Sequence, residues 1–185
     1  MIKIMIDAGH GPQTAGKRSP DGTLREFNFN RAVAELVKKE LVAEGISVSF
    51  AHDDQKDVPL SERTQKANKL NVDAFVSIHA NAYGSGWNSA NGIETYIYPT
   101  ASKGSQLLAE LVQRSLITAC NRADRGVKKG NFAVLRDTKM PAILIECGFM
   151  THREEAALLL QLSYQKQCAK AIAFAILAWV YRGKK

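Results

Sequence analysis

Two histidines and a glutamate each stand at the end of a short apolar run in this chain. The runs are 2–6, with His10 four positions after its end, 74–78, followed directly by His79, and 142–145, followed directly by Glu146. Runs rich in β-branched residues predict strands, and in an open α/β sheet ligands and catalytic groups gather beyond the carboxyl ends of the strands. The three side chains therefore predict a metal site that carries out hydrolysis.

His10 lies between Gly9 and Gly11, which allow a tight backbone turn and the close approach of a ligand. A single histidine at a strand end is more often structural, but the second instance at His79 favours two imidazoles that converge on a metal. Glu26, at the start of a predicted helix, is the natural third ligand, although the helix dipole alone also favours a glutamate there. Two histidines and one carboxylate leave a fourth position open, as in catalytic zinc sites.

Glu146 ends a strongly apolar strand, where little in the local sequence calls for a charge. A carboxylate beside an activated water can take its proton and later pass one to a leaving amine. We therefore expect Glu146 to be the catalytic acid and base; the alternative is a buried ion pair with an arginine. Cys147 should turn to the opposite face of the strand and is not expected to be a ligand.

His52 is the main rival as a metal ligand, because it also follows a predicted strand. Its context, Asp53-Asp54-Gln55-Lys56-Asp57, is very polar and favours a solvated loop instead. His152 lies in a segment in which Thr151 and Glu154 form a capping-box pattern, and we expect it at the surface.

Strands alternate with helices along the chain, which predicts a three-layer α/β sandwich around a mostly parallel sheet with helices on both faces. The 92–98 strand is a candidate for an antiparallel strand at an edge. The expected strands are 2–6, 46–51, 72–78, 92–98, 132–135 and 142–146. The expected helices are 29–41, ended by Gly45, then 61–70, 102–119, one opening at Thr151, and 163–181.

The length of 185 residues and the 45% hydrophobic content suit one packed domain, which we place at 1–185. Three cysteines without CxxC spacing indicate neither a disulfide framework nor a thiolate zinc site. The apolar run 169–181 is too short to cross a membrane. Because Met1 leads directly into a strand, we expect no secretory signal and synthesis in the cytoplasm.

Lysine and arginine outnumber aspartate and glutamate by 25 to 18, which gives a net charge of +7. This surplus favours anionic partners such as acidic cell-wall polymers, although ordinary solubility charge explains it equally well. No basic cluster interleaved with aromatic residues indicates nucleic-acid binding.

Taken together, the motifs resemble the zinc-dependent N-acetylmuramoyl-L-alanine amidases of the amidase-3 type. As a set they are highly specific, and the resemblance covers about 2–181. The matching segments are Asp7-Ala8-Gly9-His10-Gly11, Glu26, Ser77-Ile78-His79-Ala80-Asn81, Gly92-Ile93-Glu94-Thr95-Tyr96, Arg125-Gly126-Val127-Lys128, Val134-Leu135-Arg136 and Glu146-Cys147-Gly148-Phe149.

The resemblance implies that His10, Glu26 and His79 bind one zinc ion, that Glu146 is catalytic and that Asn81 lines the substrate groove. It further implies hydrolysis of the amide between N-acetylmuramic acid and the first L-alanine of peptidoglycan. The chain departs from the family at Cys147, usually aliphatic, and at His52, often arginine.

The expected absence of a secretory signal resembles phage endolysins, or lytic enzymes of sporulating cells, that reach the wall after release. We expect a monomer. Two other functions stay open: a zinc peptidase that cuts within the stem peptide, and a non-catalytic wall-binding module that has kept the fold. Both would place the chain on the cell wall.

Overall fold

The computed structural model describes residues 1–14 and 16–183. The strands are β1 (Lys3–Ala8), β2 (Ser47–Phe50), β3 (Ala74–Asn81), β4 (Ile93–Ile97), β5 (Asp124–Lys129) and β6 (Ala142–Phe149). The helices are α1 (Glu26–Ala43), α2 (Leu60–Leu70), α3 (Lys103–Cys120), α4 (Ala133–Arg136), α5 (Arg153–Leu159) and α6 (Leu162–Arg182).

The six strands form one sheet in the order β2-β1-β3-β6-β4-β5. The neighbours β2, β1, β3 and β6 are all parallel, so that their carboxyl ends lie at the same edge. β4 runs antiparallel to β6 and parallel to β5. The predicted three-layer α/β sandwich with a mostly parallel sheet is therefore confirmed.

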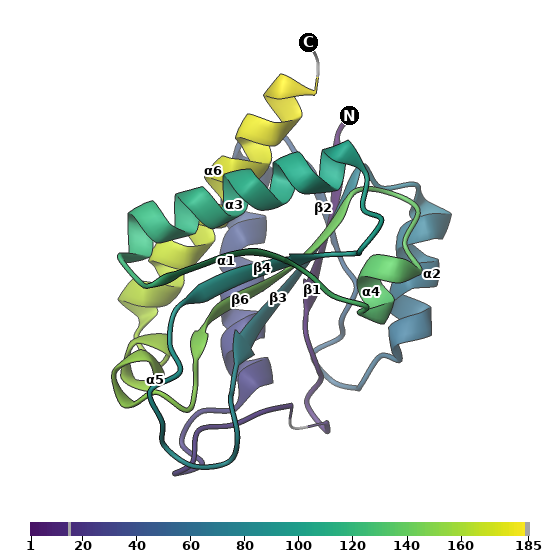
Figure 1. Ribbon diagram of the computed structural model, residues 1–185. Coiled ribbons are helices and arrows are strands. Elements are labelled where there is room, and N and C mark those ends of the chain that lie inside the picture. Colours follow the sequence, from purple (N-terminus) through teal and green to yellow (C-terminus); the bar gives the residue numbers. More distant parts are fainter. Residues whose placement is uncertain (15, 184–185) are drawn as a thin grey trace.

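Helices cover the two faces of the sheet unequally (Figure 1). The long helices α1, α3 and α6 pack together over one face and bury the larger apolar core. On the other face the cover is α2 and the single turn α4, which enclose a smaller cluster around Phe75 and Leu144. This second face is consequently open beyond the ends of α2 and α4.

Strand alternation decides which side chains lie on the open face. Phe75 and Leu144 belong to the smaller cluster, whereas Val76 and Ile145 belong to the larger one. Ser77 and His79 follow Phe75 by two and four positions, and Glu146 follows Leu144 by two, so all three lie on the same face as Phe75 and Leu144. Asp7 and Glu94 lie on this face as well, because they pair in register with Ser77 and Glu146. Ser77, His79 and Glu146 therefore share the open face, at the carboxyl end of the sheet.

Several expected elements differ in detail. The segment 132–135, predicted as a strand, forms the helical turn α4, because an apolar run of four residues does not distinguish a strand from a helix. β4 is antiparallel but is not an edge strand, since β5, which was not predicted, pairs with its outer side. His79 lies within β3 rather than beyond it, and β6 continues past Glu146 to Phe149.

The cap of α5 is also different from the predicted one. His152, not Thr151, is the N-cap residue, and its ring nitrogen accepts from the amide of Glu155. The hydroxyl of Thr151 is occupied elsewhere, because it accepts a hydrogen bond from the backbone amide of Tyr83. His152 is half-buried rather than fully at the surface.

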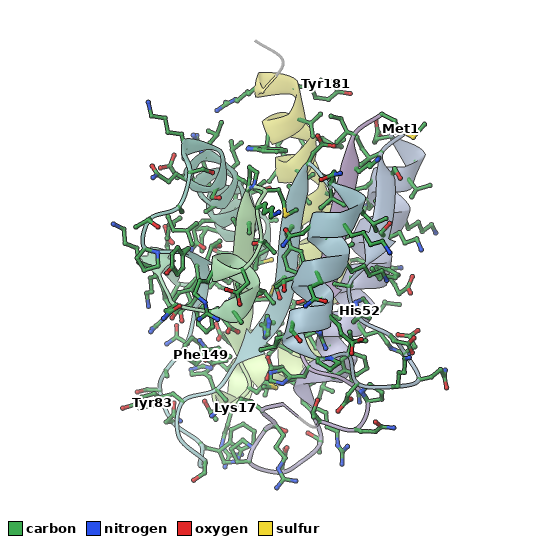
Figure 2. All side chains as sticks on the ribbon, turned by 90° about the vertical axis from the view of Figure 1, so that its right-hand side faces the viewer. Met1, Lys17, His52, Tyr83, Phe149 and Tyr181 are labelled. Carbon is green, nitrogen blue, oxygen red and sulfur yellow. The ribbon has the colours of Figure 1, made fainter. Side chains whose placement is uncertain are left out.

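The three cysteines are free and buried, and Cys147 packs in the larger core, on the face opposite to Glu146 as expected. No helix in the described part of the chain is long and apolar enough to cross a membrane. Figure 2 places Lys17 and Tyr83 at one end of the molecule and Met1 and Tyr181 at the other.

Candidate active site

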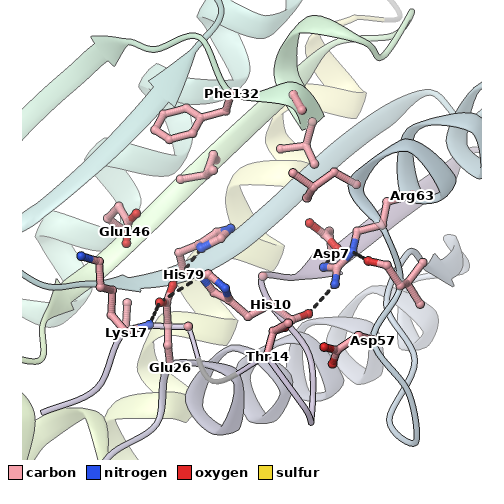
Figure 3. A pocket seen from close by; sticks show the side chains of 18 of the residues that line it. Asp7, His10, Thr14, Lys17, Glu26, Asp57, Arg63, His79, Phe132 and Glu146 are labelled. Carbon is pink, nitrogen blue, oxygen red and sulfur yellow. Dashed lines mark hydrogen bonds and ion pairs between the residues drawn. The ribbon is translucent and has the colours of Figure 1, made fainter.

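The structure brings His10, Glu26 and His79 together at the carboxyl edge of the sheet (Figure 3). His10 follows β1, Glu26 is the first residue of α1, and His79 lies near the end of β3. One donor atom from each of the three lies within 4.8 Å of the others. Three elements distant in sequence therefore supply one compact donor set.

The carboxylate of Glu26 occupies the middle of this set. Its Oε2 lies 3.1 Å from Nε2 of His10, and its Oε1 lies 2.9 Å from Nδ1 of His79. The backbone amide of Lys17 donates to Oε2 at 2.8 Å. Burial by itself would raise the pKa of Glu26, but the hydrogen bonds with both histidines and their charges outweigh burial and hold the pKa well below its usual range. The residue is thus an anion over the whole neutral range.

Two glycines make room for the imidazoles. A Cβ on Gly9 would lie 2.0 Å from Cε1 of His79, so that only a residue without a side chain fits against this ring. Gly16 has φ +60°, and a Cβ there would lie 2.7 Å from the ring of His10 and 2.9 Å from Oε2 of Glu26. His10 itself adopts the left-handed φ of 68°. The backbone at Gly9 and Gly16 therefore leaves no room for a side chain beside the donor set.

The donor set fits a divalent transition metal. Two imidazole nitrogens and one carboxylate are the ligands of many catalytic zinc sites, which keep a further position for water or substrate. A metal ion at this position would also neutralise the buried anion of Glu26. His10, Glu26 and His79 are the residues that could hold such an ion.

Glu146 pairs in register with His79 on the neighbouring strand β6 and lines the same cavity. Among the residues that the structure describes, nothing forms a hydrogen bond with its buried Oε2. Burial, followed by the negative charges of Glu26 and Glu94, raises the pKa of Glu146 well above its usual value. The alternative role of Glu146, a buried ion pair with an arginine, does not occur among the described side chains.

Asn81, the last residue of β3, also lines the cavity. Its Nδ2 donates to Oε1 of Glu94 at 2.9 Å, and its Oδ1 accepts from the amide of Ala82 at 2.8 Å. These bonds fix the orientation of the amide and leave one Nδ2 hydrogen for another acceptor.

Glu94 is a site residue that the sequence analysis did not single out. It is 2% exposed, and its Oε2 accepts from Nε of Arg125 at 2.6 Å and from Nζ of Lys128. Burial raises its pKa, but the hydrogen bonds from Lys128, Arg125 and Tyr96 outweigh burial and lower it. A glutamate within an otherwise apolar-alternating strand was the signal that could have revealed it.

Comparisons with known proteins agree with this arrangement. Residues 4–178 match the Amidase_3 family, N-acetylmuramoyl-L-alanine amidase. The chain belongs to this family.

Individual members of the family are similar over nearly the whole chain. The N-acetylmuramoyl-L-alanine amidase LytC of Bacillus subtilis is 38% identical over 91% of this chain. This chain spans 34% of LytC, and 80% of the YqiI protein of the same organism. The crystal structure of an N-acetylmuramoyl-L-alanine amidase from Clostridium difficile 630 has a TM-score of 0.92 and 36% identity, with 97% of this chain and 96% of that chain covered.

A second solved structure belongs to a catalytic domain. CwlV, an N-acetylmuramoyl-L-alanine amidase from Bacillus (Paenibacillus) polymyxa var. colistinus, gives a TM-score of 0.90 at 34% identity, with 97% of this chain and 98% of that chain covered. The fold described above is therefore the fold of this amidase family.

The candidate site of this family member opens into a cavity of about 840 Å³. One side carries the donor set with Glu146 and Asn81. The other side is mainly apolar and comes from the start of α2 and from α4, through Val58, Pro59, Leu60, Phe132, Ala133 and Val134. Leu60 and Phe132 remain 53% and 38% exposed, so that this apolar side is accessible to a ligand.

His52 is not part of the donor set, but it is also not in a solvated loop. It is 6% exposed, packs 4.6 Å from the ring of Phe50, and its Nδ1 accepts from the amide of Ala8 at 3.0 Å. The polar residues that follow it misled the prediction, because only the residues after His52 turn to solvent. His52 supports the end of β1, the strand that leads to His10.

Proposed function

We propose that this chain is a zinc-dependent hydrolase that cuts the amide between N-acetylmuramic acid and L-alanine in peptidoglycan. One observation carries the proposal: a His-Glu-His donor set lies beside Glu146, which lines the same cavity and has a buried carboxylate oxygen without a hydrogen-bond partner among the described residues, in a member of an amidase family. Hydrolysis of an amide requires both an electrophilic centre and a proton carrier, and these residues meet both needs.

Zinc is the metal that we propose for His10, Glu26 and His79. At a site with such ligands zinc polarises a carbonyl and lowers the pKa of water to about 7. The compact donor set, with its pre-ionised Glu26, favours a small divalent ion of this kind.

Glu146 is the residue that we propose to move the proton. Its carboxylate takes a proton from the attacking water and then delivers one to the amide nitrogen of the departing L-alanine, so that the stem peptide leaves as a neutral amine. A raised pKa suits both steps, because an acid with a pKa nearer to neutral can lose and regain its proton at neutral pH.

The remaining groups of the cavity bind the substrate in this proposal. The amide hydrogen of Asn81 that is left free by Glu94 faces substrate acceptors. The apolar side formed by Val58 and Phe132 suits the methyl groups of the lactyl ether and of L-alanine, which flank the scissile bond. Arg125 and Lys128 neutralise Glu94, so that this second buried carboxylate does not repel the substrate.

Digestion of defined muropeptides, with the products identified by mass spectrometry, tests the proposal. The expected products are intact glycan and stem peptides with a free L-alanine amino terminus. A chelator should abolish their formation and zinc should restore it. Cleavage within the stem peptide would establish the zinc peptidase instead, and binding to walls without turnover would establish a non-catalytic module.

The biological setting that we propose is lysis of the bacterial cell wall, by one catalytic domain at 1–185 that acts as a monomer. An endolysin of Bacillus phage SPP1 is 32% identical over 92% of this chain. A sporulation-specific amidase of Bacillus subtilis is 34% identical over 94% of it, which is why sporulation is the second candidate setting. The rates of lysis of vegetative walls and of spore cortex, measured at equal enzyme concentration, distinguish the phage setting from the sporulation setting.

A further inference from the structure

The hydroxyl of Ser77 lies between a carboxylate and one of the proposed metal ligands. Its Oγ is 2.7 Å from Oδ2 of Asp7 and 3.0 Å from Nε2 of His79. Ser77 is 0% exposed and Asp7 is 1% exposed, so that water does not compete for these hydrogen bonds. The contact links the side of the His79 ring that faces away from Glu26 to the interior of the protein.

Asp7 forms a buried ion pair with Arg63. Nη1 of Arg63 donates to its Oδ1 at 2.7 Å, and Arg63 is itself 3% exposed. An ionised carboxylate can only accept hydrogen bonds. The single hydroxyl hydrogen of Ser77 is therefore directed to Asp7, and toward His79 the Ser77 oxygen presents only a lone pair.

This direction determines the tautomer of His79. The nitrogen that faces Ser77, Nε2, must carry the hydrogen of a neutral imidazole, because it can only donate to that lone pair. The other nitrogen, Nδ1, forms the 2.9 Å hydrogen bond with Oε1 of Glu26 in this structure, and a metal held by the donor set would replace the hydrogen of that contact and use the lone pair of Nδ1. A neutral imidazole binds a metal only through such an unprotonated nitrogen.

The same arginine also holds the backbone on the other side of the donor set. Arg63 donates to the carbonyl oxygens of Ala8, at 2.8 Å, and of His10, and its Nε donates to that of Val58 at 2.9 Å. The ion pair with Asp7 and the left-handed turn at His10 are thus fixed to α2 by a single guanidinium. The positions of both histidines therefore depend on one buried polar network.

We propose that Ser77 is a positioning residue, oriented by Asp7, that selects the tautomer of His79 required for metal binding. The inference rests on the proposed function, because it assigns Ser77 to the same zinc site. Ser77 touches neither the metal nor the substrate, and it acts only through His79.

The test compares the zinc affinity of Ser77→Ala with that of the wild-type chain, by competition with a chromogenic chelator. The expected loss is about 10- to 100-fold, the range for removal of a hydrogen-bond partner behind a metal-bound histidine. Ser77→Thr, which keeps the hydroxyl, should restore most of the affinity. Ser105→Ala is the matched control: Ser105 is a buried serine that accepts from the amide of Ala142, away from the donor set, and its loss should leave the affinity unchanged.

A second measurement reads the tautomer directly. In zinc-loaded protein with ¹⁵N-labelled histidine, Nε2 of His79 should carry a slowly exchanging hydrogen that is lost in Ser77→Ala and retained in Ser105→Ala. Unchanged zinc affinity and an unchanged signal in Ser77→Ala would overturn the inference, and so would an equal loss of affinity in Ser105→Ala. In each of these cases a wild type that binds zinc and cleaves muropeptides leaves the proposed function intact. A wild type that binds no zinc overturns the proposed function itself.

Discussion

Glu94 and Glu146 face each other across the antiparallel pairing of β4 and β6, and within the described part of the chain cationic partners contact only Glu94. Arg125 and Lys128 keep Glu94 ionised, and its charge in turn contributes to the raised pKa of Glu146. The pKa values of two neighbouring carboxylates are thereby shifted in opposite directions: that of Glu94 is lowered and that of Glu146 is raised. Glu94 therefore stays ionised, whereas Glu146 can exchange a proton.

The first prediction concerns Glu146→Gln. The amide keeps the size of the carboxylate and removes its proton chemistry, so the variant should fold and bind zinc as the wild type does. Turnover on muropeptides should fall by about 10²- to 10⁴-fold, the range for a positioned general acid or base. A thermal melt, a zinc assay and turnover on one preparation make the measurement. A destabilised variant with full activity would contradict the catalytic role.

The second prediction concerns the pH dependence set by Glu94. A general base must be deprotonated, so activity is lost as the pH falls through the pKa of Glu146. Glu94→Gln removes one of the charges that raise this pKa. The acid limb of kcat/KM should therefore move to lower pH. Glu110→Gln, an exposed glutamate on α3, is the control and should leave the profile in place.

The third prediction concerns the contact between Gly9 and His79. Gly9→Ala would place a methyl group 2.0 Å from Cε1 of the ring, so the imidazole must move. Zinc affinity should fall by about 10- to 100-fold, as for other changes that disturb the support of a metal ligand. Gly86→Ala is the control, because a Cβ at Gly86 meets no atom within 4 Å. Equal zinc affinity in Gly9→Ala and Gly86→Ala would show that the ring position does not govern binding.

The fourth prediction concerns His52 and stability. Burial lowers the pKa of His52, and Arg63 and Lys66 add to this, while Asp7 and Asp54 oppose it. Below about pH 6.5 the unfolded chain takes up the proton before the folded one does, so the free energy of unfolding must fall as the pH decreases. The slope from this one group reaches at most about 1.4 kcal/mol per pH unit.

Denaturant titrations between pH 8 and pH 5 compare the wild type with His52→Asn. The asparagine oxygen can still accept from the amide of Ala8, so the variant removes the titration and keeps the hydrogen bond. It should be less stable at pH 8, because the contact with Phe50 is lost, and its stability should depend less steeply on pH. Zinc content should be retained. An unaltered slope would show that His52 is not the titrating group.

The fifth prediction concerns the net charge of +7. If this charge holds the protein near anionic wall polymers, attachment to intact walls should weaken as salt is raised, because exposed charges are screened beyond about 10 Å at 0.1 M. Sedimentation with purified walls at increasing salt makes the measurement, with walls stripped of anionic polymers as the control. Binding that does not depend on salt would assign the surplus to solubility alone.

The local sequence was sufficient to predict the parallel strands at the centre of the sheet. Runs such as 74–78 and 142–145 are apolar on both faces, which only a strand buried between helices satisfies, and a buried parallel strand ends at the edge where functional groups collect. His10, His79 and Glu146 could be picked out for this reason, and their positions at the carboxyl ends of predicted strands were enough to expect that they meet.

Other parts of the site depend on contacts that no local pattern encodes. Glu94 and Arg63 looked like ordinary charges of an alternating strand and a polar helix, and they are buried only because β6 and the end of β1 pack against them. His52 was judged by its polar neighbours, whereas its burial follows from the strand that it supports.

The sequence by itself therefore determined the layered fold and the residue types of the site, since hydrophobic periodicity and strand-end chemistry are local properties. Only the tertiary structure decided which nitrogen of His79 faces the donor set and which of two paired glutamates is neutralised. The reason is physical: protonation, tautomer and burial depend on the partners across 70 residues of chain, as between Asp7 and Ser77, and not on the residues next in sequence.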